Sequence, residues 1–142
     1  MEVPVIAFHA TLKTDQQHTG LHQSVAFDNV ITNIGGAYNP HFGTFIAPVP
    51  GVYVFYTKIL GYRNHILYLS VVKNGAMVAG LYVRDAEGLY DNDSAMVVLH
   101  LAKGDDVAVR SDDSDKYING NHFSMFSGFL LHDDVTTVSI VG

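Results

Sequence analysis

Val52 to Leu60, VYVFYTKIL, is the stretch with the strongest strand signal in the chain. Successive side chains of a β-strand point to opposite faces of the sheet, and here both faces are mainly apolar. One face carries Tyr53, Phe55, Thr57 and Ile59, and the other carries Val52, Val54, Tyr56 and Lys58. We therefore expect this strand to be covered on both sides, by the facing sheet of a small antiparallel sandwich and by another subunit.

Shorter stretches of the same kind lie on either side of this segment, separated by turn signals. They are Val5 to Thr11, Val25 to Ile34, Phe45 to Ala47, Ile66 to Lys73, Ala76 to Val83, Ser94 to Ala102, Val107 to Arg110 and Phe123 to Leu131. Asn74-Gly75 is typical of a type I′ hairpin, because both central residues of that turn need positive φ. Leu12 to His22, residues 84 to 93 and Ser111 to His122 are polar, and we expect loops there. The pattern predicts an all-β fold, an antiparallel two-sheet sandwich or jelly roll.

Composition bounds the classes of function. The 142 residues, 48% hydrophobic and 15% charged, suit a single folded domain over 1–142. No apolar run has the length of a membrane helix, so we expect no membrane insertion. A formal charge of −6 with few, unclustered Lys and Arg argues against nucleic acid as a partner. The absence of Cys excludes thiol catalysis, disulfides and thiolate zinc sites.

Motifs that would indicate an enzyme are missing from the sequence. There is no Gly-x-Ser-x-Gly elbow, phosphate-binding loop, dinucleotide fingerprint or metalloprotease motif. The eight His residues do not pair at metal-ligand spacing. His9 and His100 fall in predicted strands, where we expect packed side chains. The sequence therefore favours a binding protein over an enzyme.

An ordered set of motifs identifies a family resemblance. Seven residues stand at the spacings of one family signature: Phe27, Asn33, Tyr38, Phe45, Gly51, Tyr53 and Phe55. Lys73-Asn74-Gly75, Gly104-Asp105 followed by Val107, and the closing residues 126–131 match further family motifs. Over about residues 5–132 the chain resembles the globular head domain of complement C1q, a jelly roll shared with tumour necrosis factor. Thr57 and Ala108 replace a signature aromatic and a frequent Trp. We expect the seven residues to be core and turn formers.

The resemblance implies a function as well as a fold. Domains of this family form compact homotrimers, and head-only members, abundant in bivalve molluscs, act as lectins or pattern-recognition proteins of innate immunity. It implies a secreted, extracellular protein, although Met1 to Pro4 lack the features of a signal peptide. Its mechanism would be avidity, with three weak sites engaging glycans or other patterns on a microbial or cell surface. The alternative is a trimeric signalling ligand for a protein receptor, which a contiguous apolar side patch would favour.

The acidic loop Arg84 to Asp93, RDAEGLYDND, is a candidate metal site. Calcium takes several oxygen ligands, and four carboxylates lie close together in this loop. The resemblance implies a calcium site in the matching loop near the trimer apex, with Asp85 and Asp91 at the best-aligned positions. A solvated acidic turn is the alternative interpretation.

Two further loops carry the residue types that bind sugars, namely amides, carboxylates and aromatic rings. In Gly61 to His65, Arg63 could hold the carboxylate of a sialic acid, beside Tyr62 and His65. Ser111 to Asn121 contributes the same residue types, namely Asp112, Asp113, Lys116, Tyr117, Asn119 and Asn121. We expect an acidic or N-acetylated sugar there, with ordinary solvent-exposed loops as the alternative.

Two other stretches complete the set of candidates. His41-Phe42 is a weaker candidate site, where an aromatic side chain could be exposed. The tail, residues 133–142, contains a candidate extra strand, Val135 to Val141, which we expect to pair with a sheet edge or to dock on a neighbouring subunit.

Overall fold

The computed structural model describes residues 3–62, 64–84, 88, 90–113 and 116–134, with the backbone alone at positions 17, 18 and 116. The elements in this part of the chain are all strands: β1 (Ala7–Thr11), β2 (Gln16–Thr19), β3 (Asn29–Ile34), β4 (Tyr38–Asn39), β5 (Thr44–Ile46), β6 (Gly51–Leu60), β7 (Ile66–Lys73), β8 (Ala76–Arg84), β9 (Asn92–Leu101), β10 (Asp106–Ser111), β11 (Lys116–Ile118) and β12 (Met125–Asp133). The candidate tail strand falls outside the described residues. No helix in the described residues is long and apolar enough to cross a membrane.

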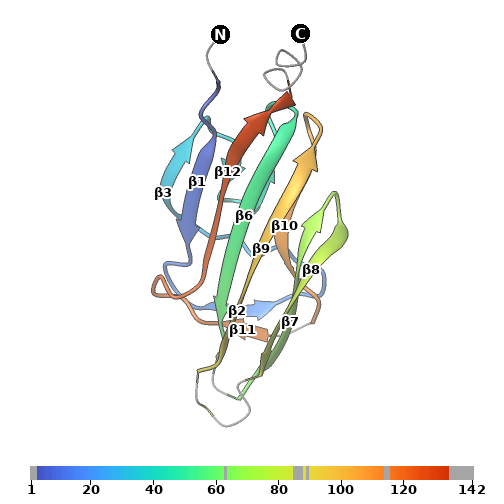
Figure 1. The fold of residues 1–142 in the computed structure, drawn as a ribbon. Coiled ribbons are helices and arrows are strands. Elements are labelled where there is room, and N and C mark those ends of the chain that lie inside the picture. Colours follow the sequence, from blue (N-terminus) through green and yellow to red (C-terminus); the bar gives the residue numbers. More distant parts are fainter. Residues whose placement is uncertain (1–2, 63, 85–87, 89, 114–115, 135–142) are drawn as a thin grey trace.

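Two five-stranded antiparallel sheets form the body of the domain (Figure 1). One sheet has the order β3-β1-β12-β6-β9, and the other has the order β4-β5-β10-β7-β8. The stretch Val52 to Leu60 is the greater part of β6, which lies between β12 and β9 and pairs with both over most of its length. At its first residue, Gly51, a Cβ atom would lie 2.5 Å from the carbonyl oxygen of His132, so β12 can approach only a glycine there.

The predicted loops contain a third, two-stranded sheet. β2 and β11 pair with each other, Thr19 opposite Lys116 and Gln16 opposite Ile118. Their sequences, QQHT and KYI, are too short and polar to alternate, so periodicity could not reveal a pairing between segments about a hundred residues apart. Residues 25–28, predicted as strand, precede β3, and the amide of Val25 donates to the carbonyl of Val109 at 2.7 Å instead.

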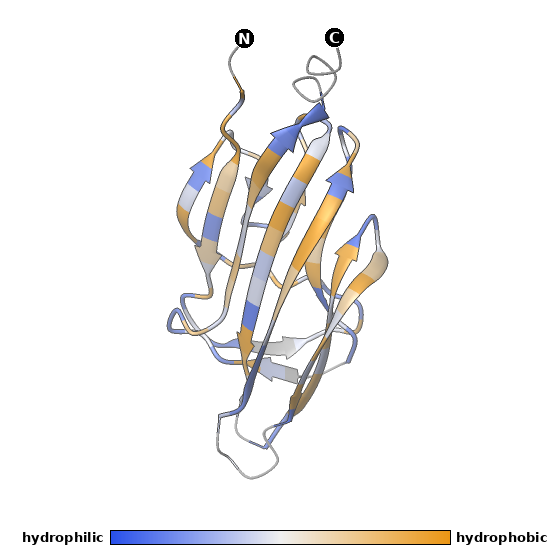
Figure 2. Ribbon diagram, viewed as in Figure 1, coloured by the Kyte–Doolittle hydropathy of each residue, from blue (hydrophilic) through white to orange (hydrophobic). Residues whose placement is uncertain are grey.

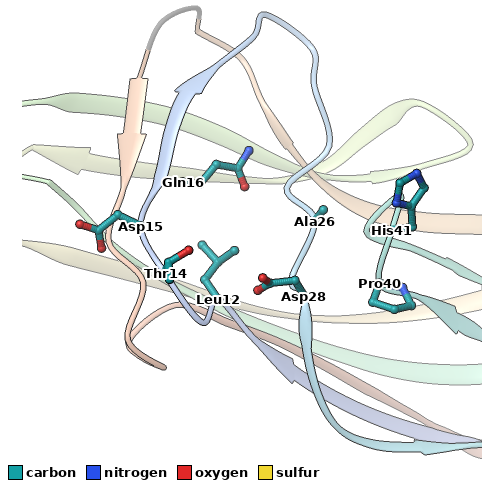
Figure 3. A pocket seen from close by; sticks show the side chains of 8 residues that line it. All are labelled: Leu12, Thr14, Asp15, Gln16, Ala26, Asp28, Pro40 and His41. Atoms are coloured by element: carbon teal, nitrogen blue, oxygen red, sulfur yellow. The ribbon is translucent and has the colours of Figure 1, made fainter.

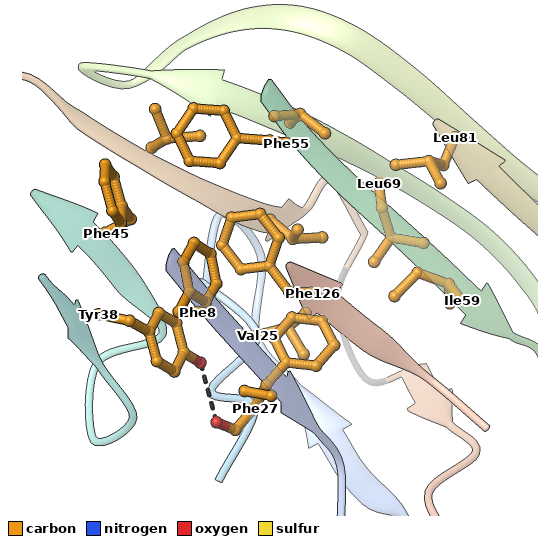
Figure 4. Close-up of a cluster of buried hydrophobic side chains, with 14 of the residues drawn as sticks. Phe8, Val25, Phe27, Tyr38, Phe45, Phe55, Ile59, Leu69, Leu81 and Phe126 are labelled. Carbon is orange, nitrogen blue, oxygen red and sulfur yellow. Dashed lines mark hydrogen bonds between the residues drawn. The ribbon is translucent and has the colours of Figure 1, made fainter. Parts of the chain in front are cut away.

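Aromatic side chains fill the space between the sheets (Figure 4). Tyr38 stacks on Phe8 with ring centroids 4.7 Å apart, and its hydroxyl donates to the carbonyl of Phe27 at 2.9 Å. Burial raises the pKa of Tyr38 far above its ordinary value. The side chain of Asn33 fixes the same residue, because its amide donates to the Tyr38 carbonyl at 2.9 Å and its oxygen accepts from the Tyr38 amide at 3.2 Å. The signature residues are therefore core and turn formers, as the sequence predicts.

The outward face of the β3-β1-β12-β6-β9 sheet is rich in exposed apolar side chains. Met96 is 67% exposed and Val98 is 58% exposed on β9, and Phe129 and Leu131 are exposed on β12. Val54 of β6 pairs with Val98 on one side and with Phe129 on the other. Figure 2 shows the apolar residues along these three neighbouring strands. We call this surface the apolar sheet face. Within one protomer, only the opposite face of β6 is fully covered.

The two strand histidines differ in their surroundings. His9 is half-buried, and its Nδ1 is within hydrogen-bond distance of the Ser127 hydroxyl. His100 is exposed, and its Nε2 lies 2.9 Å from the carboxylate of Asp134. The prediction of a packed His100 is wrong for the protomer, because the alternation of β9 turns Leu99 and Leu101 toward the core and His100 outward.

Candidate functional site

Backbone contacts bring the two predicted sugar-binding loops side by side. Gly61 forms a β-bridge with Ile118, and the amide of Asn119 donates to the carbonyl of Leu60 at 3.0 Å. The amide of Gly61 also donates to the Asp91 carbonyl at 2.9 Å, which ties the acidic loop to the same region. The end of β6, the end of β11 and the start of β9 thus meet at one place.

Three half-buried rings gather where these loops meet, and we call Tyr62, His65 and Tyr117 the ring cluster. The His65 and Tyr117 rings stack with centroids 4.9 Å apart and an interplanar angle of 15°. Tyr62 lies edge-on to both, at 5.9 Å from His65 and 5.2 Å from Tyr117. The turn that places them is closed by the His65 amide, which donates to the Tyr62 carbonyl at 3.0 Å, and Asn64 has a φ of 59°.

The ring cluster has the chemistry of a sugar-binding platform. Aromatic side chains that are partly exposed offer an apolar face, while tyrosine hydroxyls and an imidazole offer hydrogen bonds beside it. The mutual packing of the three rings holds each in place, so little conformational entropy remains to be lost when a ligand binds. A pyranose ring, apolar on one face and polar at its edge, matches such a surface.

The remaining predicted ligand residues are arranged differently. Asp113 accepts from the backbone amide of Tyr68 on β7 at 3.1 Å, and the backbone of Asn119 is bonded to Leu60 and to the hydroxyl of Ser124. One oxygen of Asp113 therefore serves the loop rather than the ring cluster. Arg63 and the side chain of Lys116 lie outside the description, so their place in the site stays a prediction.

Two carboxylates of the acidic loop accept hydrogen bonds from backbone amides. The carboxylate of Asp91 accepts from the amide of Arg84 at 3.2 Å, and that of Asp93 accepts from the amides of Tyr82 and Ser94. Asp85 and Glu87 are not among the described residues. Within the described residues no three His, Asp or Glu side chains gather at a spacing suited to a metal ion. Calcium binding through Asp85 and Asp91 stays a prediction.

Comparison with known proteins places this chain in a family. The model of the C1q domain matches residues 7–131. The chain belongs to the C1q domain family. It is 35% identical to complement C1q tumor necrosis factor-related protein 3 of Mus musculus and of Homo sapiens over 129 residues, which cover 90% of this chain and 52% of each relative. It is 32% identical to Caprin-2 of Danio rerio over 130 residues, 91% of this chain and 14% of that protein.

Solved structures agree on the fold of this C1q domain. The globular domain of zebrafish complement 1qA protein superposes with a TM-score of 0.71 at 23% identity, covering 91% of this chain and 99% of that one. Murine APRIL gives 0.70 at 16% identity, covering 89% and 99%. The prediction of an antiparallel two-sheet jelly roll is confirmed. The chain spans about half the length of its C1q/TNF-related relatives, so their full activities do not transfer to it directly.

Proposed function

We propose that this C1q domain is the recognition part of a secreted homotrimer that binds acidic or N-acetylated glycans and catalyses no reaction. The ring cluster is the observation that carries the proposal. It joins two loops that both carry residue types suited to sugar binding, and it presents three rings on a rigid sandwich.

The apolar sheet face supports the homotrimer. Exposed apolar side chains that are neighbours on one sheet face favour burial against a partner, because their contact with water is unfavourable. It is centred on the strand whose sequence predicted a cover by another subunit. Three copies burying this face would cover Val54, Val98 and Phe129.

A sialylated glycan fits the residues around the ring cluster. Tyr62 and Tyr117 would contact the sugar ring, His65 would donate a hydrogen bond, and Arg63 would pair with the carboxylate through two parallel hydrogen bonds. The charge of −6 opposes an anion at long range. At ordinary salt this field is screened within about 8–10 Å, whereas a direct bidentate contact is not. Three sites on one rigid body then bind a repeating surface by avidity.

A receptor ligand is the second candidate function. It is favoured by the relatives named as C1q tumor necrosis factor-related proteins. It is also favoured by two exposed tyrosines on the other sheet, Tyr68 of β7 and Tyr82 of β8, whose rings lie 5.0 Å apart. Exposed tyrosines are frequent in protein interfaces.

A glycan array probed with the purified chain tests the first function against the second. We expect sialylated or N-acetylated glycans to bind the wild type and to lose most binding to Arg63→Ala and Tyr117→Ala. Tyr82→Ala removes a ring from the surface suited to a receptor and should bind glycans like the wild type. Glycan recognition at the ring cluster would be refuted by an array without such hits. It would also be refuted if Arg63→Ala and Tyr117→Ala each bound these glycans as strongly as the wild type does.

A further inference from the structure

An open groove that shares no residue with the ring cluster lies between residues 12–16, 23–28 and 40–44. It consists of two adjoining hollows of about 520 and 490 Å³, and both are lined by Ala26 and His41. Each volume falls in the range of roughly 300–1,000 Å³ that is usual for small-molecule sites. Val25 and Phe27 point into the core and are fully buried, so Ala26 between them faces outward. Its small methyl group keeps the floor of the groove open.

A rigid turn holds an exposed aromatic ring at this groove. The Asn39 side-chain oxygen accepts from the amides of His41 and Phe42, and the amide of Gly43 donates to the Asn39 carbonyl at 2.8 Å. Gly43 has a φ of 71°, and a Cβ there would lie 2.1 Å from the carbonyl oxygen of Val25. Phe42 is left 64% exposed, edge-on to His41 at 4.8 Å, which confirms the prediction of an exposed aromatic.

Polar groups with unused hydrogen-bonding capacity line the same groove. One oxygen of Asp28 accepts from the amide of Lys13 at 3.0 Å, and its other oxygen has no hydrogen bond within the described residues. Figure 3 shows the Gln16 amide and the Asp28 carboxylate on the pocket wall around Leu12 and Ala26, with His41 beyond Ala26. Asp15 points away from them and anchors the loop, because its carboxylate accepts from the amide of Gly120 at 2.7 Å.

We propose that this groove binds a neutral saccharide. The pyranose ring would lie against Phe42 and Ala26, a pair of sugar hydroxyls would donate to Asp28, and the Gln16 amide would bond to a further hydroxyl. A carboxylate on the wall repels an anionic sugar, so the ligand class differs from the one proposed for the ring cluster. The turn fixes the backbone at Phe42, and its ring contacts His41 while staying mostly exposed, so a bound sugar can reach the ring.

Titration of the ¹⁵N-labelled chain with methyl α-D-mannopyranoside and methyl α-D-galactopyranoside, followed by NMR, tests this proposal. We expect at least one glycoside to shift the amide signals of Ala26, Phe42 and Gly43. Ala26→Phe fills the groove and should abolish these shifts. Phe42→Ala, a surface change that leaves the core intact, should weaken binding roughly two- to tenfold through loss of ring contact. Tyr82→Ala removes another exposed ring, 44% exposed on β8, and should bind as the wild type does.

The variants separate this proposal from the proposed function. Tyr117→Ala should lose the sialylated glycan and keep the affinity for the neutral glycoside, whereas Phe42→Ala should bind the neutral glycoside roughly two- to tenfold more weakly and keep the sialylated glycan. The groove proposal is overturned if neither glycoside shifts these signals, if the shifts persist in folded Ala26→Phe, or if a lysine-rich peptide binds there and the glycosides do not.

Discussion

Val98→Asp is the substitution that should separate assembly from folding. Val98 lies on the apolar sheet face opposite Val54 and is 58% exposed in the protomer, so a carboxylate there meets water in the monomer. In a trimer built on this face the same carboxylate would be buried among apolar groups. Lost apolar burial costs about 1 kcal/mol, and an unpaired buried carboxylate costs at least about 2 kcal/mol more.

The expected penalty is therefore about 3 kcal/mol per protomer and about 9 kcal/mol per trimer, which corresponds to roughly six powers of ten in the dissociation constant. Sedimentation velocity at micromolar concentration should show a trimer for the wild type and a monomer for Val98→Asp, with the circular dichroism of the fold retained.

Met77→Asp is the matched control for this experiment, because Met77 is 60% exposed but lies on β8 of the other sheet. It should sediment as the wild type does. If Val98→Asp stays trimeric, the apolar sheet face is not the interface between the subunits.

Three further predictions concern the core, a turn and the acidic loop. Tyr38→Phe removes the donor to the buried Phe27 carbonyl and should lower the free energy of unfolding by about 1–3 kcal/mol, seen as a lower urea midpoint; an unchanged midpoint would contradict the hydrogen bond's role. The pKa of Asp105 lies below its ordinary 3.8, first because the Asn74 amide donates to it and then because of the Ala102 amide. The contribution of the ionised Asp105 to the stability of the fold is complete above that ordinary pKa and is lost as pH falls through the lowered pKa. The difference in Tm between wild type and Asp105→Asn should therefore shrink in acid and should not grow. Calorimetry should detect calcium binding by the wild type and none by Asp91→Ala. Equal binding by the two would show that Asp91 is not a calcium ligand, and no binding by the wild type would show that the acidic loop is not a calcium site.

Local sequence patterns predict most of the strands and turns of the fold. Alternation located β6 to within one residue of its observed start, and Asn74-Gly75 forms the predicted hairpin turn with φ values of 49° and 81°. Both features are set by residues that are adjacent in the sequence, so the local pattern is enough to predict them. The β2–β11 pair forms between two polar segments that are far apart in the sequence, and neither segment contains a pattern that predicts its pairing partner.

Only the part of the candidate site that depends on residue type and loop position could be predicted from the sequence. Residue type and loop position selected Tyr62, His65 and Tyr117, and the fold brings these three together. Residue type could not show that Asp113 bonds to the backbone of Tyr68, because that contact joins segments 45 positions apart. His100 was assigned to a packed position because the sequence alone could not say which face of β9 meets the core.

The most direct test of glycan recognition is an amide-resolved NMR titration of the assembled chain with 3′-sialyllactose. We expect saturable shifts centred on Tyr62, His65, Tyr117 and Asn119, and their loss in Arg63→Ala. No shift at these residues, or shifts confined to β7 and β8, would contradict the ring cluster as the glycan site.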